Sequence, residues 1–285
     1  GWTTLGKILL ILFFIISGFF IQSPQNISFL PMPNDTSLIF SSGFAVSLVW
    51  VSYAYTGWNS TVYIAGEIKN PQKNIHYSLL MSTAFVTILY ILLNFIFLFS
   101  TPMSEMKGMI EVGYISGVKI FGDQGGKIVS GGIALLLLST ISSYVFIGPR
   151  ITQVIGEDLA YLRFFSITNK SGIPINGFIF QLCISLFFIF TSTFEQVLLY
   201  AGITFIIINT ITIFGVIVLR FYHPDLERPY RSWGYPWTQI IFILSNLWIL
   251  YFTFKNQVFE SLIGIGIIFF SLIMYFSGQK FSNKG

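Results

Sequence analysis

SLVWVSYAYTGWNSTVYIAGEIKNPQKNI, residues 47–75, decides the fold of this chain. The stretch begins as an apolar helix and reaches the small or flexible residues Ala54, Thr56 and Gly57 in its middle. It then becomes apolar again before a polar exit at 67–74. We predict one membrane span that is interrupted near Thr56 and Gly57; the alternative is an intact helix whose glycine packs against a neighbour. An interrupted helix exposes carbonyl groups from its first half and amide groups from its second, which suits a zwitterion or a cation.

The composition indicates a membrane protein. Of 285 residues, 54% are hydrophobic and 9% are charged, with a mean hydropathy of +0.77, whereas soluble domains carry roughly a quarter charged residues. The net charge of +4 comes from Lys and Arg scattered through short loops, which argues against a nucleic-acid partner. Cys183 is the one cysteine, so no intrachain disulfide can form. His76 and His223 lie far apart in sequence, and we expect no metal site, no cofactor and no enzymatic activity.

Apolar runs divide the chain into eight predicted spans, most of them close to the roughly 20 residues that cross a bilayer. They cover residues 3–21, 38–66 (broken near 54–57), 77–99, 128–149, 177–194, 197–220, 236–254 and 258–276. We predict an extended loop at 22–35 and a longer loop at 101–126 that can hold short interfacial helices. The expected fold class is an all-α membrane protein, a multi-span helix bundle forming a single transmembrane domain over residues 1–285.

Alternate loops differ in positive charge. One set of loops holds Lys69, Lys73, Arg150, Arg163, Lys170, Arg220, Arg228, Arg231, Lys280 and Lys284, and the other holds only Lys107, Lys119, Lys127 and Lys255. Because cytoplasmic loops carry the excess of Lys and Arg, we predict that both chain ends are cytoplasmic and that the loops at 22–37 and 101–126 face outward. We expect local salt bridges among Asp225, Glu227, Arg228 and Arg231.

YAYTGWNSTVYIAGEIKNPQKNI, residues 53–75, resembles the sixth transmembrane helix of the amino acid–polyamine–organocation (APC) family. That pattern runs aromatic, small, aromatic, small, Gly, and then an acidic residue followed by I-K-N-P-x-(R/K)-N. Arg150, Gly156 and Pro174 follow in the family's order in a loop, and LRFYHPDLERPYRSWGYP, residues 219–236, resembles the loop between helices ten and eleven. The resemblance covers the whole chain as family helices five to twelve. It implies part of the APC/LeuT-type inverted-repeat transporter fold, with a broken second span.

The resemblance also implies a function, the secondary active transport of amino acids by alternating access, coupled to protons or by exchange. One alternative is a polyamine or organic-cation carrier, and another is a non-transporting membrane remnant or interaction module. The implied partners are a small-molecule substrate, an amino acid, and the lipid bilayer, in the plasma (inner) membrane. The oligomeric state stays open.

The family's substrate-binding residues correspond to a short segment here. The resemblance implies that Tyr53 is the aromatic gate over the substrate, although a packing aromatic is the alternative. The backbone carbonyls of Tyr53, Ala54 and Thr56 would surround the substrate's ammonium group, and Gly57, Trp58 and Asn59 would lie nearer its side chain. Many family members have Gly where this chain has Thr56.

The resemblance implies an ion-coupling group at Lys7, where some members place a lysine in the position of a sodium ion. An amine inside a helix bundle is costly and usually functional, although a lysine near a helix end can also extend to the interface. The family's ion-site oxygens come from the span that contains Ser139, Thr140, Ser142 and Ser143. Of these hydroxyls we favour Ser142 and Ser143; the alternative is that they bond the preceding turn.

Gly1 coincides with the start of what resembles family helix five. Family helices one to four would then lie outside this sequence, including the first helix with its carboxylate-binding break. We therefore expect that the chain expressed as given inserts in a membrane but does not transport.

Overall fold

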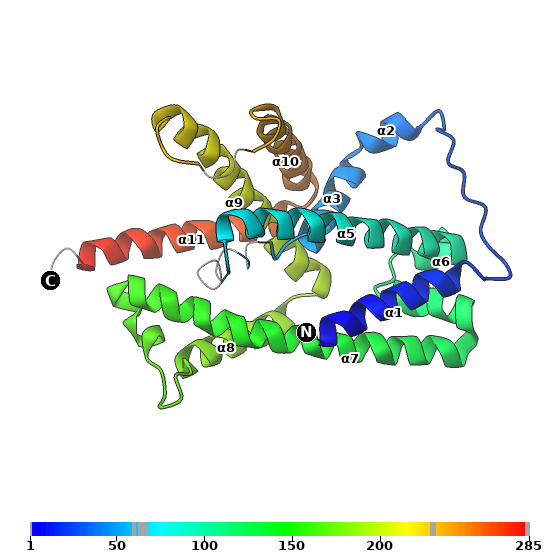
Figure 1. The fold of residues 1–285 in the computed structure, drawn as a ribbon, viewed down its shortest axis with the longest axis horizontal. Helices are drawn as coiled ribbons and strands as arrows, with labels where there is room; N and C mark the ends of the chain where they lie inside the picture. The colour runs from blue at the N-terminus through cyan, green and yellow to red at the C-terminus, as the bar shows by residue number, and fades with distance from the viewer. Residues whose placement is uncertain (1, 59–60, 62–67, 229–231, 283–285) are drawn as a thin grey trace. The chain divides into compact units, whose positions relative to one another are not determined.

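The computed structural model describes residues 2–58, 61, 68–228 and 232–282, and its regular structure is helical throughout that part of the chain. Figure 1 shows the helices in chain order. They are α1 (Trp2–Gly18), α2 (Asp35–Ile39), α3 (Ser42–Ala54), α5 (Pro71–Ser100), α6 (Met103–Met106), α7 (Val112–Asp158), the 3₁₀ helix η2 (Ala160–Ser166), α8 (Ile175–Thr191), α9 (Phe194–Tyr222), α10 (Trp237–Asn256) and α11 (Val258–Ser282).

Each predicted span overlaps at least one of these helices, and the number of spans stays a prediction. Among the described residues, α5, α7, α9, α10 and α11 are the five helices long and apolar enough to cross a membrane. The helices α1, α3 and α8 are apolar but shorter. Large apolar side chains such as Phe20 and Phe190 are 81% and 82% exposed. Such exposure is unfavourable in water, and these helices are those of an integral membrane protein.

The helix ends differ from the predicted spans at several positions. α5 begins at Pro71, where proline suits the first turn because its missing N–H needs no partner there. α7 continues past Pro149 to Asp158, so Arg150 and Gly156 lie in a helix and not in the expected loop. The Pro149 carbonyl accepts a hydrogen bond from the Thr152 hydroxyl at 2.8 Å.

The predicted loop at 101–126 is largely helical. It contains α6 and the first part of α7, which changes direction at Gly122. Gly122 has φ 74° and ψ 176°, a conformation that glycine adopts without a steric penalty. Short helices were expected in this loop, but the direct continuation into the following span was not.

The chain divides into two compact units. Unit 1 comprises residues 1–31 and 78–147. Its core holds Phe14, Ile15, Leu89, Ile96 and Val129, and Phe14 makes edge contacts with the rings of Phe97 and Phe121. A Cβ atom at Gly18 would come within 2.3 Å of the Ile96 side chain, so α1 and α5 approach closely there.

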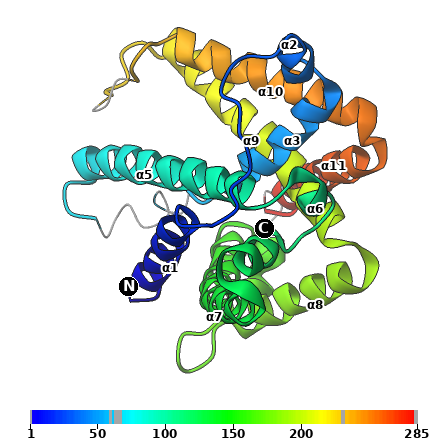
Figure 2. The same ribbon diagram turned by 90° about the vertical axis from the view of Figure 1, so that its right-hand side faces the viewer.

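Unit 2 comprises residues 32–77 and 148–285. In this unit α3 packs against α9 and α10, and α9 also packs against α10 and α11. Figures 1 and 2 show α3 beside α9 in both views. The core residues are Val49, Leu199, Ile203, Ile206, Ile249 and Leu250. A Cβ atom at Gly202 would lie 2.6 Å from the Val49 side chain, so this glycine sets how closely α3 and α9 meet.

Candidate functional site

The helix that was predicted to break does end at the expected place. Ser41 caps the start of α3 by accepting a hydrogen bond from the Phe44 N–H at 3.2 Å. The helix ends at Ala54, and residues 55–58 form a turn in which Gly57 has φ 103°. Among the described residues beyond its chain neighbours, none has an atom within 4 Å of a Cβ built on Gly57, so glycine is needed there for its backbone angle. The continuation of the span, including 62–66, lies outside the described residues.

Carbonyl groups at the end of α3 accept hydrogen bonds from residues that follow closely in sequence. The Tyr55 N–H donates to the Ser52 carbonyl at 3.3 Å, which is the tighter spacing of a 3₁₀ turn. The Tyr53 carbonyl accepts the Thr56 N–H at 3.0 Å and the Thr56 hydroxyl at 2.7 Å. A carbonyl oxygen has two lone pairs. Both donors to the Tyr53 oxygen described here therefore come from a single residue, Thr56.

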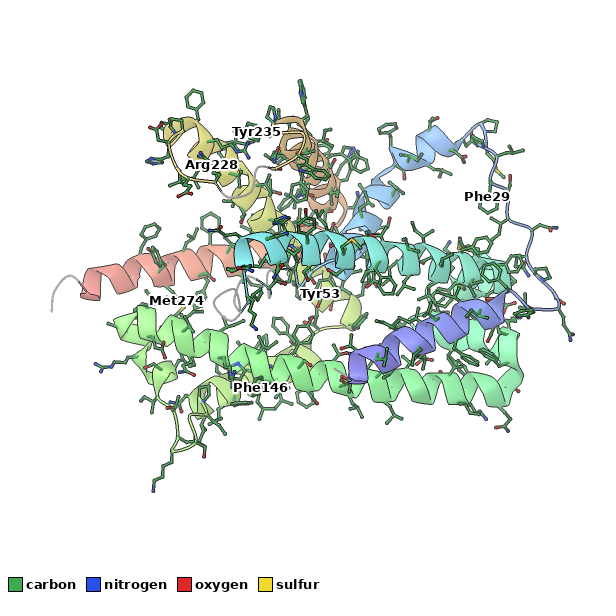
Figure 3. All side chains as sticks on the ribbon, viewed as in Figure 1. Phe29, Tyr53, Phe146, Arg228, Tyr235 and Met274 are labelled. Carbon is green, nitrogen blue, oxygen red and sulfur yellow. The ribbon has the colours of Figure 1, made fainter. Side chains whose placement is uncertain are left out.

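The predicted gate residue lies at the surface of unit 2. Tyr53 is 38% exposed, and its ring centroid lies 6.4 Å from that of Phe205 on α9 (Figure 3). Trp58 is 43% exposed. Ala54 is the last residue of α3, and Thr56 and Gly57 lie in the turn that follows. Five of the six predicted substrate residues therefore lie in the described segment 53–58, where they are neighbours in sequence. Asn59 lies outside the described residues.

The predicted coupling residues lie in unit 1. The Lys7 ammonium group on α1 donates a hydrogen bond of 2.7 Å to the Thr140 hydroxyl on α7, and both side chains are half-buried. The Thr140 hydroxyl in turn donates to the Leu136 carbonyl at 3.3 Å. The lysine therefore meets a hydroxyl of the predicted serine and threonine run.

The structure does not bring Lys7 to the two serines that the sequence favoured. The hydroxyls of Ser142 and Ser143 donate to carbonyls of the preceding turn, Leu138 at 3.0 Å and Ser139 at 3.1 Å, and both residues are exposed. Only the side of α7 that carries Thr140 faces Lys7 in unit 1. Residues 136 and 140 share one helix face, and Leu136 lies beside Gly6 of α1, 3.7 Å from a Cβ built there. The sequence gives no signal for which face of this helix meets α1.

In the loop after α9, Arg228 forms other bonds than the expected local salt bridges, and Arg231, the other arginine of that expectation, lies outside the described residues. Arg228 donates to the backbone carbonyls of Leu219, His223, Pro224 and Leu226 at 2.7 to 3.3 Å. The guanidinium carbon of Arg220 lies 3.8 Å from the centre of the Tyr235 ring. Within the described residues, the salt bridge that forms is Lys119–Glu105, in unit 1. The arginine was paired with carboxylates in the prediction because sequence does not reveal the exposed carbonyls of a helix end.

The described residues contain no cluster of three or more His, Cys, Asp and Glu side chains that could hold a metal ion. What the site offers is a helix end with carbonyl oxygens, flanked by aromatic rings, and a separate lysine–hydroxyl pair. A helix carboxyl end carries about half a negative charge, so it attracts a cation without a buried carboxylate.

The sequence model of the amino acid permease family matches residues 1–278. The chain belongs to this family. Among the similar proteins, the Large neutral amino acids transporter small subunit 2 of Mus musculus is 25% identical over 291 residues, which cover 99% of this chain and 53% of that protein. The b(0,+)-type amino acid transporter 1 of Mus musculus is 26% identical over 277 residues, 96% of this chain and 56% of that protein. Solute carrier family 7 member 12 of Mus musculus is 27% identical over 209 residues, 73% and 45% of the two chains.

Membership in the permease family confirms the resemblance inferred from residues 53–75 and 219–236. It also confirms the predicted class, an all-α membrane protein of a transporter family and not an enzyme. The permease chain spans about half the length of the curated relatives it matches.

Proposed function

We propose that this permease takes part in the secondary transport of amino acids across a membrane, and that the end of α3 binds the substrate's ammonium group. The observation that carries the proposal is the end of the apolar helix α3 at Ala54, followed by a turn with Gly57 at a positive φ. Two of the relatives named above are amino acid transporters by name. Binding at a broken helix needs no charged side chain in the membrane, where such a charge is costly.

Thr56 has a defined part in this proposal. Its hydroxyl and its N–H both donate to the Tyr53 carbonyl. Rotation of the Thr56 side chain would release one lone pair of that oxygen to the substrate's ammonium group. Hydrogen bonds between a charged donor and a neutral acceptor are stronger than those of a hydroxyl, so the substrate would displace the hydroxyl. Thr56→Val should therefore lower the apparent KM several-fold, and Thr56→Ser should leave it close to wild type.

Tyr53 is proposed as the gate. Uptake of labelled amino acids into liposomes that contain the full-length protein, with large neutral and cationic amino acids and a polyamine compared in parallel, tests the function. Tyr53→Ala should reduce uptake at least tenfold and change thermal stability little. Phe44→Ala is the matched control, because Phe44 lies on the same helix and is 41% exposed. Equal loss of uptake in the two variants would reject the gate, uptake of the polyamine alone would indicate an organic-cation carrier, and uptake of none would indicate a non-transporting module.

Coupling is assigned to Lys7 in this proposal, with proton coupling or exchange in place of sodium. The support is the 2.7 Å bond between the Lys7 ammonium and the Thr140 hydroxyl. Lys7→Ala should abolish the pH dependence of uptake, and Thr140→Val should weaken it. Ser142→Ala and Ser143→Ala are compared in the same assay, because these serines were the favoured partners. Unchanged pH dependence in Lys7→Ala would remove the lysine from the mechanism.

The charges of the loops support a proposal for the membrane and for the orientation of the chain in it. The loops with most Lys and Arg, including the one after α9 with Arg220 and Arg228, lie on the cytoplasmic side of the plasma membrane, and both chain ends lie there too. Cysteine labelling from outside at Ser104 and at Ser171 separates the two sides. Labelling of Ser171→Cys in intact cells, with Ser104→Cys protected, would invert the proposed orientation.

A further inference from the structure

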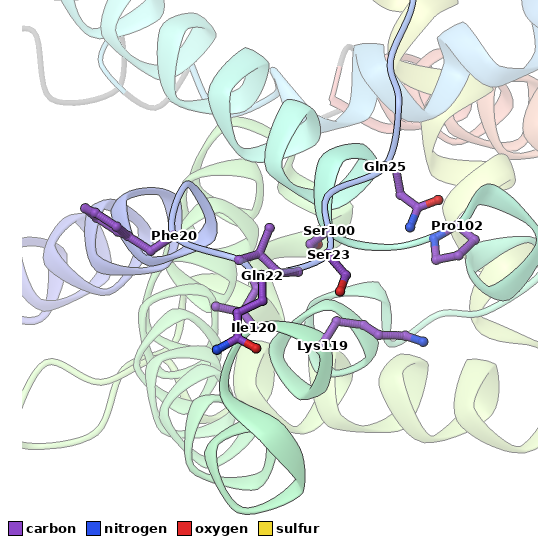
Figure 4. Close-up of a pocket in the computed structure, with 9 residues that line it drawn as sticks. Phe20, Gln22, Ser23, Gln25, Ser100, Pro102, Lys119 and Ile120 are labelled. Atoms are coloured by element: carbon purple, nitrogen blue, oxygen red, sulfur yellow. The ribbon is translucent and has the colours of Figure 1, made fainter.

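A polar cavity lies in unit 1, away from the Lys7–Thr140 pair. Its volume is about 520 Å³, within the roughly 300–1,000 Å³ of small-ligand sites. The walls come from the segment after α1, the end of α5 and the first part of α7 (Figure 4). The polar side chains at the cavity are Gln22, Ser23, Gln25, Ser100 and Lys119.

The walls of this cavity are held by hydrogen bonds. The Gln25 N–H donates to the Phe99 carbonyl at 2.7 Å, which fastens the segment after α1 to the end of α5. Ser100 lines the cavity and is 2% exposed, and its hydroxyl lies 3.2 Å from that of Thr101. Thr101 donates to the Ser116 hydroxyl on α7 at 3.0 Å. A chain of buried hydroxyls therefore connects the two helices behind the cavity.

Lys119 is the only charged residue among the nine that line the cavity. Its ammonium group lies 3.1 and 3.0 Å from the two carboxylate oxygens of Glu105, and the two side chains are 41% and 45% exposed. Ion pairs exposed to this degree stabilise a protein little. An ammonium group has three donors, so Lys119 can bind an anion in the cavity while it stays near Glu105.

These groups fit an oxyanion with an apolar attachment. The amides of Gln22 and Gln25, the hydroxyl of Ser23 and the ammonium of Lys119 can all donate hydrogen bonds to oxygen atoms. Phe20 lines the same cavity and is 81% exposed. The apolar helices α1 and α5 both end here, which is the level at which a membrane helix leaves the hydrocarbon and meets the headgroups.

We propose that this cavity binds the phosphate headgroup of an anionic phospholipid, with an acyl chain passing over Phe20. The test measures binding of fluorescent phosphatidylglycerol to the detergent-solubilised protein, with phosphatidylcholine as the second lipid and inorganic phosphate as competitor. Lys119→Gln should weaken phosphatidylglycerol binding at least fivefold. Lys107→Gln should change it less than twofold, because Lys107 is an exposed lysine of the same loop that does not line the cavity.

Glu105→Gln should change phosphatidylglycerol binding in the opposite direction from Lys119→Gln. It removes the carboxylate that competes for Lys119, so phosphatidylglycerol should bind about two- to fivefold more tightly. If the ion pair were only a clamp between α6 and α7, both variants would lower the melting temperature and neither would separate the two lipids. Unchanged phosphatidylglycerol binding in Lys119→Gln, or equal binding of phosphatidylcholine, would overturn the proposal. Complete competition by millimolar phosphate, with no preference for the lipid, would assign the site to soluble phosphate and overturn the lipid headgroup.

Discussion

The carboxyl ends of α3 and α9, both in unit 2, are closed by different donors. At α9 the guanidinium group of Arg228 donates to four backbone carbonyls, including those of Leu219 and His223 (Figure 3). At α3 the Tyr53 carbonyl accepts donors of Thr56, a residue of the adjoining turn. At α9 the donor is a permanent cation from a loop. At α3 the donors are the backbone N–H and the hydroxyl of Thr56, and rotation of the side chain can remove the hydroxyl.

This difference separates a structural helix end from one that can serve a substrate. Both ends present the same negative partial charge. A guanidinium group keeps its charge at any physiological pH and has five donors in a fixed plane, so it satisfies the α9 carbonyls continuously. A hydroxyl forms a weaker bond to a carbonyl. At the end of α3 an ammonium group can therefore replace the Thr56 hydroxyl as donor. At the end of α9 an ammonium group would have to displace the guanidinium group of Arg228, which is the stronger donor.

The end of α3 is held in place because α3 packs against α9. Gly202→Val should disrupt this contact and cause the largest loss of stability among the variants considered below. A Cβ at Gly202 would lie 2.6 Å from the Val49 side chain, and Val49 is fully buried. Overpacking of this kind costs up to about 3 kcal/mol. Thermal and denaturant-induced unfolding in detergent measure the loss. Adding Val49→Ala should restore part of it; equal stability of the single and double variants would mean that the two helices do not meet there.

Gly57→Ala should destabilise the turn after α3. Its φ of 103° disfavours any side chain, at a cost of about 1–2 kcal/mol. Gly215→Ala is the control, because Gly215 lies within α9 with nothing within 4 Å of a Cβ. Alanine should stabilise that position by about 0.5–1 kcal/mol. If Gly57→Ala and Gly215→Ala changed the free energy of unfolding in the same direction, the α3 turn would not require a positive φ.

Arg228→Gln should weaken the end of α9 by about 1 kcal/mol, because the amide cannot span the four carbonyls and carries no charge. Arg228→Lys should recover little of this, since an ammonium group lacks the planar arrangement of donors. Hydrogen exchange of the last turn of α9 provides the local measurement. Full recovery by lysine would show that charge alone closes the helix.

Thr56→Val should have the smallest effect, about 0.5 kcal/mol of stability, because the Thr56 N–H still donates to the Tyr53 carbonyl. Thr56→Ser keeps the hydroxyl and should match the wild-type protein in unfolding experiments. A loss in Thr56→Val as large as that in Arg228→Gln would remove the distinction between the two helix ends.

Much of the fold could be predicted from local sequence. The positions of the apolar helices follow from run length, since a membrane helix satisfies its backbone within itself. The interruption after Ala54 follows from the small residues and Gly57 in an apolar span, and the structure has a helix end there. Helix limits were less predictable. α7 continues through Pro149 to Asp158, although a proline in a helix lacks the N–H that would donate to the carbonyl four residues earlier and usually ends or kinks the helix.

The sequence by itself determined the membrane class, the family and the segment that holds Tyr53, Thr56 and Gly57, because these depend on composition and on residues adjacent in the chain. Only the tertiary structure decided which partners distant residues take. Lys7 meets Thr140, 133 positions away, and not Ser142 or Ser143. Arg228 meets carbonyls in place of carboxylates. The physical reason is that a helix turns by 100° per residue, so one position along α7 changes the face that meets α1, and only the packed helices fix that face.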